Sequence, residues 1–361
     1  MRGIRQFTIL LLLFSICACN FQGKNKYETK VITETLSGVE LETTDFEGSG
    51  IVGFYGDYLL LKEIRDTSRL IVYKIHNDSL VLFRRLVDRG RGPREFYYVE
   101  YALSGDSLFI SNSDPSGIIS IYGISLTDMS KIDDSNRWKE YLFPKEDAMM
   151  TGLSFAHYKG NQFIVAAGKA DTRQILTFAD FDKGELKPID FWPKDSTRGP
   201  LHAKQMVYMQ SKICSQRDRI LYANLNARYM FIAKYIDGVL EPLSVIYSHL
   251  PQYTVLQDGN IRYKDTGEQG ILLGTTPEKI FAQIGRTEKE INASETYKGY
   301  PKWYVDQIEV YDWDGNFIAN YQTDRPFYSF AVSSDNHYLY TMSIDLDEGN
   351  HVVMRYELPS R

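Results

Sequence analysis

Short apolar runs separated by Gly, Asp and Asn recur along most of the chain, and strong helical periodicity is scarce. The clearest units are hairpins, in which two runs rich in Tyr, Ile, Val and Phe flank a tight turn. These turns fall at Asn77–Asp78, Lys183–Gly184, Asp237–Gly238 and Asp314–Gly315. Asp-Gly and its relatives suit such turns because both central residues need a positive φ. The pattern therefore predicts an all-β protein built from hairpins.

The spacing of the hairpins predicts how they are arranged. Asp78 and Gly184 lie 106 positions apart, or two units of 53, and Gly184 and Gly238 lie 54 apart. Upstream of each hairpin lies another strand pair, and the second strands of these pairs read YLLLKEI, SLFISNS, QFIVAAG, RILYANL, KIFAQIG and YLYTMSI. Six units of four strands, each near fifty residues, are typical of a six-bladed β-propeller.

The two ends of the chain predict how the ring closes. The sixth unit stops at Arg361 one strand short, whereas Tyr27–Leu36 reads as a strand with no hairpin of its own. We expect this strand to complete the last blade, because an open ring would leave an unpaired edge. A β-sandwich with a second domain is the alternative. Since no Pro- or Ser-rich linker divides the chain, residues 27–361 are interpreted as a single domain.

Residues 1–18 have the character of a signal peptide. Arg2 and Arg5 precede a short apolar run, Phe7–Ile16, which is too short for a mature membrane span. The run ends in ICAC, which resembles a bacterial lipobox with Cys19 as the lipidated residue, because Cys17 is preceded by the bulky Ile16. A secretory signal cut elsewhere and an uncleaved anchor are the alternatives.

Residues 19–26 read as a short polar tether behind the lipid. The resemblance is to lipoproteins exported from a diderm bacterium, and Asn20 fits onward sorting to the outer membrane. No acidic cluster of the kind found in many surface-exposed lipoproteins follows Cys19. We therefore expect an outer-membrane lipoprotein of the cell envelope that faces the periplasm.

Composition narrows the class of protein. After cleavage before Cys19 only Cys214 would remain as a further cysteine, so we expect no internal disulfide and a fold held by its core. A hydrophobic content of 43% with 14% aromatic residues is typical of a globular chain. Loss of Arg2 and Arg5 changes the formal net charge from −6 to −8, which argues against nucleic acid as a partner.

The stretch DRGRGPREF, Asp88–Phe96, lies between the predicted first and second blades. It lacks the third glycine of a dinucleotide fingerprint and the Lys-Ser/Thr of a P-loop, and it suits a chain that turns sharply. It resembles the Gly-x-Gly-Pro-Gly-Glu-Phe element of six-bladed, TolB-like propeller lipoproteins of Bacteroidetes. The matching residues are Gly90, Gly92, Pro93, Glu95 and Phe96, while Arg94 replaces the third glycine. The resemblance implies the fold and the location, and this group has no general activity to carry over. We interpret the loop as a structural corner.

One face of the predicted propeller should carry the variable loops. Connections from outer to inner strands and from second to third strands share that face, which is where propellers usually bind partners. It would collect the loop residues Arg89, Arg91 and Arg94 and an insertion of about 23 residues, which falls largely in Arg286–Trp303. The insertion brings three aromatic residues, Tyr297, Tyr300 and Trp303. Arg, Tyr and Trp are typical interface anchors, and aromatic rings also stack on sugars. A long solvated loop is the alternative.

Specific catalytic motifs are lacking. The six histidines are scattered over five predicted blades, without a His-Glu-x-x-His or Gly-x-Ser-x-Gly motif. The leading hypothesis is a non-enzymatic, lipid-anchored binding module for a protein or glycan, with no cofactor and no metal. One alternative is a propeller hydrolase or lyase with an axial metal that acts on a sugar, lactone or peptide. Another is a purely structural scaffold within an envelope complex.

Overall fold

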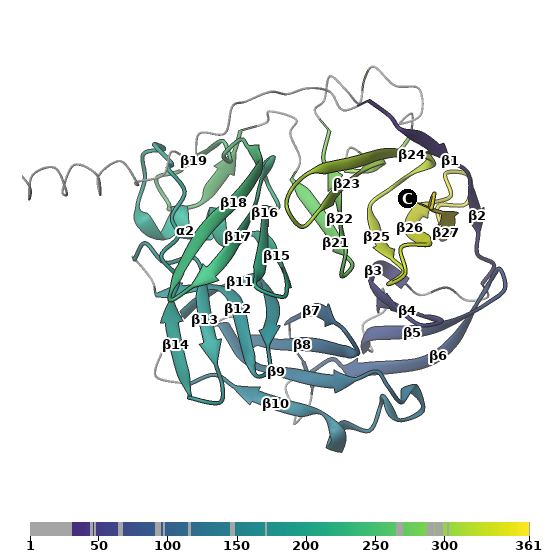
Figure 1. The fold of residues 1–361 in the computed structure, drawn as a ribbon, viewed down its shortest axis with the longest axis horizontal. Helices are drawn as coiled ribbons and strands as arrows, with labels where there is room; N and C mark the ends of the chain where they lie inside the picture. The colour runs from purple at the N-terminus through teal and green to yellow at the C-terminus, as the bar shows by residue number, and fades with distance from the viewer. Residues whose placement is uncertain are drawn as a thin grey trace, which may run out of the picture.

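The computed structural model describes residues 31–360, except 44–45, 47, 64–67, 91–94, 97, 115–116, 145–148, 170–171, 265–269, 287–291, 293–298 and 302. Six sheets of antiparallel strands surround a central axis and form a six-bladed β-propeller, as the sequence predicted (Figure 1). Cys19 and its tether lie outside the described residues.

Blades one to three follow one another along the chain, each with its inner strand first. Blade one contains β3 (Gly48–Tyr55), β4 (Tyr58–Glu63), β5 (Ser68–His76) and β6 (Ser79–Asp88). Blade two contains β7 (Tyr98–Ser104), β8 (Ser107–Asp114), β9 (Gly117–Ser125) and β10 (Lys139–Leu142), with short 3₁₀ helices η1 (Met129–Lys131) and η2 (Ser135–Arg137) before β10. Blade three contains β11 (Met149–Lys159), β12 (Gln162–Lys169), β13 (Thr177–Asp180) and β14 (Glu185–Pro188).

Blades four to six complete the ring. Blade four contains β15 (Ser211–Gln216), β16 (Arg219–Asn224), β17 (Tyr229–Ile236) and β18 (Val239–Ser248). Blade five contains β21 (Ile271–Thr275), β22 (Lys279–Ile284), β23 (Val305–Asp312) and β24 (Phe317–Phe327), and β1 (Glu34–Leu36) adds to its outer edge. Blade six contains β25 (Ser329–Val332), β26 (Tyr338–Ile344), β27 (His351–Glu357) and β2 (Gly38–Glu40).

The burial of each strand follows from its place in a blade. Second strands such as β12 and β16 are buried along nearly their whole length, because neighbouring blades cover both of their faces. Continuous apolar runs such as FIVAA, Phe163–Ala167, meet that requirement. The outer strand β18 is instead largely exposed or half-buried. The core therefore lies between the blades as a series of face-to-face contacts, and local sequence is enough to indicate it.

The predicted hairpin turns are confirmed. Asn77 and Asp237 adopt positive φ values of 53° and 48°, and Gly184 and Gly315 adopt 65° and 85°. The strands that flank each turn pair in antiparallel register. At these positions glycine or a short polar residue relieves the steric cost of the left-handed region.

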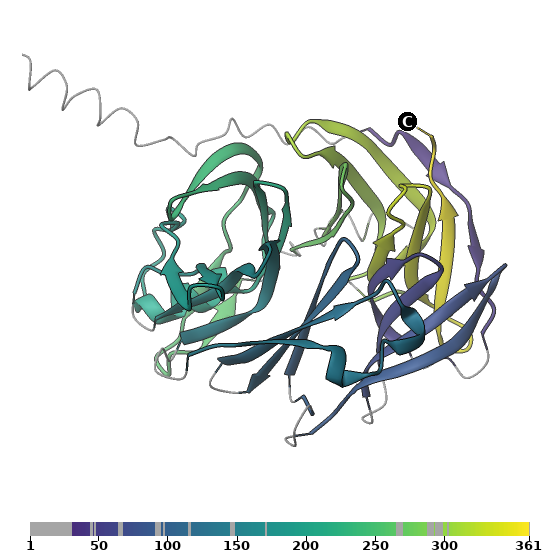
Figure 2. The ribbon, with the colours of Figure 1, turned by 60° about the horizontal axis from the view of Figure 1, so that its bottom comes forward.

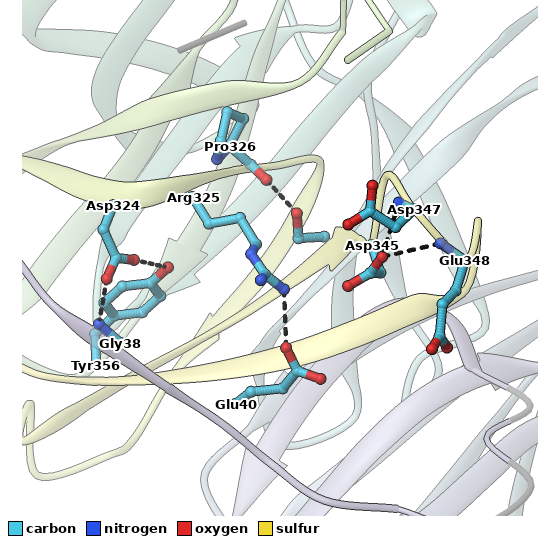
Figure 3. A network of polar contacts seen from close by, with 10 residues as sticks. Gly38, Glu40, Asp324, Arg325, Pro326, Asp345, Asp347, Glu348 and Tyr356 are labelled. Carbon is cyan, nitrogen blue, oxygen red and sulfur yellow. Dashed lines mark hydrogen bonds and ion pairs between the residues drawn. The ribbon is translucent and has the colours of Figure 1, made fainter. Parts of the chain in front are cut away.

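An N-terminal strand closes the ring as predicted, but the closing residues differ from the expected Tyr27–Leu36. The closing strand is β2, which pairs antiparallel with β27, whereas β1 runs parallel to β24 of blade five. Figure 3 shows why Gly38 suits this place: its N–H donates to Asp324 Oδ2 at 2.9 Å, and Tyr356 donates to the other oxygen of Asp324 at 3.0 Å. A Cβ on Gly38 would lie 2.6 Å from the Tyr356 ring, so only glycine lets this strand approach.

Two elements between blades three and five were not predicted. Helix α2 (Leu201–Met209) precedes β15, and a hairpin of β19 (Tyr253–Val255) and β20 (Ile261–Tyr263) lies between β18 and β21. Figure 1 shows β19 and α2 on the same side of the ring, next to blades three and four. Tyr253 donates a hydrogen bond to the carboxylate of Asp195, a residue of the segment that leads into α2. We call α2 and the β19–β20 hairpin together the cap. Figure 2 shows the same side of the ring from a second angle.

Candidate functional site

The cap, blade four and blade five line an open cavity of about 410 Å³, which we call the rim cavity. Its lining comes from the turn between β16 and β17, from the β18–β21 connection, from blade five, and from Tyr328 before β25. The connections that line it are outer-to-inner and second-to-third connections, so the cavity lies on the face that the sequence predicted for binding. We call this the upper face.

The cap wall of the rim cavity is fixed by polar contacts. Gln210 Oε1 accepts hydrogen bonds from Asn226 Nδ2 at 2.6 Å and from the Tyr263 hydroxyl at 3.0 Å. Burial raises the pKa of Tyr263 to about 12, so its hydroxyl stays a neutral donor at physiological pH. The wall on the cap side is therefore pre-formed rather than assembled by the ligand.

Two arginines hold in place the segment that follows β22 and lines the rim cavity. Arg228 Nε and Nη2 both donate to the Gly285 carbonyl, at 3.1 and 2.9 Å. Arg286 forms an ion pair with Asp306, whose side chain is only 1% exposed. These contacts fix the start of the connection between β22 and β23, which supplies Gly285 and Trp303 to the cavity lining.

Gln283 of β22 is the residue of the lining that has a buried polar atom without a hydrogen-bond partner among the described residues. Its side chain lines the rim cavity, the residue is only 3% exposed, and its Oε1 accepts no hydrogen bond from any described residue. Buried polar atoms in native proteins nearly always have a partner, and leaving one unpaired costs free energy. The buried Oε1 of Gln283 is therefore an acceptor that a donor from outside the described residues could satisfy.

A row of aromatic rings extends from Trp303, at the rim cavity, to Tyr328, which precedes blade six. Trp303 is 59% exposed and lies 6.4 Å, between ring centroids, from the buried Tyr304, which in turn lies 5.6 Å from Tyr300 and 4.9 Å from Tyr328. Tyr328 continues the row to His351, with 3.0 Å between its hydroxyl and His351 Nδ1. Burial lowers the pKa of His351, which favours its neutral form at pH 7. Trp303 thus presents an exposed ring next to the buried ring of Tyr304.

The sequence-predicted site residues divide into two groups. Trp303 lines the rim cavity and Tyr300 stands in the ring row next to it, whereas Tyr297, Arg91 and Arg94 lie outside the described residues. Arg89 is exposed between blades one and two, in a different part of the ring. The described residues thus give no single patch that unites Arg89 with the blade-five aromatics.

The motif loop has the geometry of a corner. Phe96 N donates to Asp88 O at 2.9 Å and Gly90 N donates to Phe96 O at 3.3 Å, which ties the two ends of the loop together. Phe96 is fully buried and packs edge-to-face on Tyr122 at 5.2 Å. A Cβ on Gly90 would lie 1.9 Å from the Glu95 carboxylate, so this glycine makes room for the Glu95 side chain. Gly92 and Pro93 lie outside the described residues.

A second cavity system runs along the propeller axis. It was not predicted from the sequence. All six inner strands line this axial channel, which has an upper part of about 360 Å³ and a lower part of about 200 Å³. Lys212 of β15 lines both parts. The upper part shares Leu225, Leu272 and Tyr328 with the rim cavity, so the two cavities are neighbours.

Within the described ranges, His, Cys, Asp and Glu side chains form no group of three or more that could hold a metal ion. The axial histidine, His157, has Nδ1 2.9 Å from Ser104 Oγ and Nε2 2.9 Å from the Gly160 carbonyl. The acidic turn after β26 uses Asp345 to accept backbone N–H groups of Asp347 and Glu348, as Figure 3 shows. The part of the chain that the structure describes contains no helix long and apolar enough to cross a bilayer.

Comparison with known proteins finds similar solved structures but no matching family. No protein-family model matches the chain, and no curated protein matches it. Among solved structures, U3-55K is similar at 11% identity over 88% of this chain and 98% of that chain, with a TM-score of 0.44. The RRP9 WD40 repeats are similar at 11% identity over 89% and 97%, also with a TM-score of 0.44. A chain of the Nidogen/Laminin complex is similar at 11% identity over 82% and 92%, with a TM-score of 0.41. We draw nothing about function from likeness at this level.

Several cavity residues could not be found from the sequence. Gln283, Asn226 and Tyr263 are ordinary polar or aromatic residues of strands and turns, and no motif surrounds them. The one available signal was the extra length between the hairpins at Asp237–Gly238 and Asp314–Gly315, which does supply part of the lining. Nothing in the sequence indicated that Lys212 lines the axial channel, because a lysine on a strand most often faces solvent.

Proposed function

We propose that this chain is a non-enzymatic binding module of a bacterial cell envelope, tethered to the outer membrane by a lipid on Cys19 and taking a glycan in the rim cavity. The observation that carries the proposal is that one cavity is lined both by Gln283, whose buried Oε1 has no described partner, and by the exposed ring of Trp303. An amide that can bond hydroxyls, next to an aromatic face that can stack on a sugar ring, is a combination suited to carbohydrate.

The size and shape of the cavity favour a small ligand over a flat protein surface. Ligand pockets typically enclose roughly 300–1,000 Å³, with apolar walls and a few convergent polar groups. The rim cavity, at about 410 Å³, falls within this range. A stable protein partner would instead need on the order of 800 Å² of surface on each side.

The sequence supports the cellular part of the proposal. The lipobox ending in Cys19 and the loop GRGPREF, which resembles an element of TolB-like propeller lipoproteins of Bacteroidetes, point to the same group of exported lipoproteins. We therefore include membership of that group, and a position facing the periplasm, in the proposal.

Replacing Trp303 with Ala should weaken glycan binding by at least about tenfold, or about 1.4 kcal/mol, because the stacking surface is lost. We would titrate the detergent-solubilised full chain with cellobiose, maltose and N,N′-diacetylchitobiose by isothermal calorimetry. Tyr98→Ala is the matched control, because Tyr98 is 51% exposed and lies on blade two. Failure of all neutral sugars to bind, or equal binding by the Trp303 variant, would reject the glycan.

Gln283→Leu provides the second arm of the same experiment. It removes the unpaired oxygen, so the free energy of unfolding should stay unchanged or rise, by about 1 kcal/mol, while sugar affinity falls. Gln205→Leu is the contrast: Gln205 is fully buried and donates to the carbonyls of Lys169 and Gln174, so this variant should lose stability. A stability loss in Gln283→Leu like that of Gln205→Leu would mean that Gln283 has a structural role.

Lipid attachment makes a separate prediction. Cys19→Ala should move the chain from the membrane fraction to the soluble fraction, or leave it unprocessed, because the thiol that would carry the lipid is gone. Cys17→Ala is the control and should remain with the membrane. Fractionation of cells followed by immunoblotting measures both, and a Cys19 variant that stays processed and membrane-bound would contradict the lipobox interpretation.

A further inference from the structure

Lys212 places an ammonium group in the axial channel, where the described protein groups leave its charge uncompensated. From β15 of blade four its Nζ donates to the backbone carbonyl of Tyr101 on β7 of blade two, at a long 3.3 Å. An ammonium group has three hydrogens to donate, and this is the only hydrogen bond it makes to a described residue. No described carboxylate lies within ion-pairing distance of it.

The other charges that line the upper channel cancel each other. Lys62 and Glu100 form an ion pair at 3.8 Å, so their net contribution is close to zero. Cys214 follows Lys212 by two positions on the same strand and therefore faces the same side. Burial raises the pKa of its thiol, although the nearby Lys212 charge acts in the opposite direction, so the thiol stays protonated and is no counter-ion. One positive charge is left over.

A hydroxyl donor lines the same part of the channel as the Lys212 side chain. Ser154 of β11 lines the upper channel and is only 3% exposed. Its Oγ accepts the N–H of Ile213, the residue next to Lys212, at 2.9 Å. Its own hydrogen is donated to no described residue, which leaves it available to a ligand. The Ser154 hydroxyl and the Lys212 ammonium thus line the same cavity of about 360 Å³, the first from blade three and the second from blade four.

We propose that the upper axial channel binds a carboxylate group, which pairs with Lys212 and accepts the hydroxyl hydrogen of Ser154. A singly charged carboxylate matches the single uncompensated charge, whereas a doubly charged phosphate would bring one negative charge too many into a confined space. The carboxylate site is distinct from the glycan site of the rim cavity, although the two cavities share Leu225, Leu272 and Tyr328. The carboxylate can come from a free small acid or from an acidic sugar, and both have room in this part of the channel.

The test is calorimetric titration of the detergent-solubilised full chain with four probes: acetate, D-glucuronate, D-glucose and inorganic phosphate. We expect a carboxylate to bind and phosphate to bind at least tenfold more weakly. Acetate binding would identify a free acid, and binding of glucuronate alone would identify an acidic sugar. The proposal fails if neither carboxylate binds, or if phosphate binds as tightly as the carboxylate.

Lys212→Met should weaken carboxylate binding at least tenfold and leave the thermal unfolding midpoint unchanged or raised, because an unpaired charge is removed from the channel. Lys183→Met changes the net charge equally on an exposed turn and should bind within twofold of the unchanged chain. Should Lys212→Met fail to fold, Lys212→Gln tests the same charge with a polar side chain. Unaltered carboxylate affinity in a folded Lys212 variant would overturn the proposal.

Discussion

A chain that begins at Leu41 should lose at least about 4 kcal/mol of unfolding free energy relative to one that begins at Val31. The ten missing residues contain β1 and β2, and with them Leu36, which is only 4% exposed and packs between blades five and six. Removing a buried leucine side chain alone costs about 2–5 kcal/mol. Loss of the β2–β27 ladder adds to this, since each hydrogen bond contributes on the order of 1 kcal/mol.

The same truncation should also promote association. It leaves β27 as an unpaired edge, and it removes Gly38 and Glu40, which contact Asp324 and Arg325 in Figure 3. An exposed edge strand is a template for pairing with another chain. Urea unfolding gives the free energy and size-exclusion chromatography gives the assembly state. A peptide of residues 31–40 added to the shortened chain should restore both, and equal stability of the two chains would show that closure contributes little.

Ring closure also illustrates what the sequence can and cannot predict. The hairpin turns were found because positive φ values leave a local mark, such as Asn77 or Asp237 followed by Gly238. The closing strand was placed a few residues too early, because two short strands lie side by side in sequence. The choice between them depends on distant partners, namely the Tyr356 ring and the Asp324 carboxylate.

Helix α2 escaped prediction for a related reason. It has no side-chain cap at Pro200 and no acidic residue in its first turn, so the usual starting signals are missing. Its place is secured by tertiary contacts instead, such as the two hydrogen bonds of Gln205 to carbonyls of blade three and its neighbouring loop. Packing rather than propensity stabilises a helix this short.

The candidate site was predicted only in part. Trp303 was found because an insertion rich in aromatic residues is visible as extra length. Gln283 and Lys212 were not, because a polar residue in a strand looks the same whether or not a partner meets it from the next blade. Gln283 is distinguished by a missing hydrogen bond and Lys212 by the lack of a carboxylate partner among the described residues, and both are properties of three-dimensional packing alone.

Phe96→Ala should lower the free energy of unfolding by about 3–5 kcal/mol, because it leaves a cavity under the corner between blades one and two. Phe96 is fully buried against Tyr122, and its backbone holds both ends of the motif loop. The loss should appear in urea unfolding as a lower midpoint. Phe317→Ala is the matched control, because Phe317 is 41% exposed and should lose far less.

Sugar binding by the Phe96→Ala variant distinguishes two roles of the motif loop, a structural corner and a part of a ligand site. Since the rim cavity lies between blades four and five, Phe96→Ala should keep its sugar affinity at temperatures where it remains folded. Stability would then fall while binding holds, the reverse of the expectation for Gln283→Leu. If Phe96→Ala lost binding but kept its stability, the motif loop would have to be part of a ligand site, and the structural interpretation of GRGPREF would be wrong.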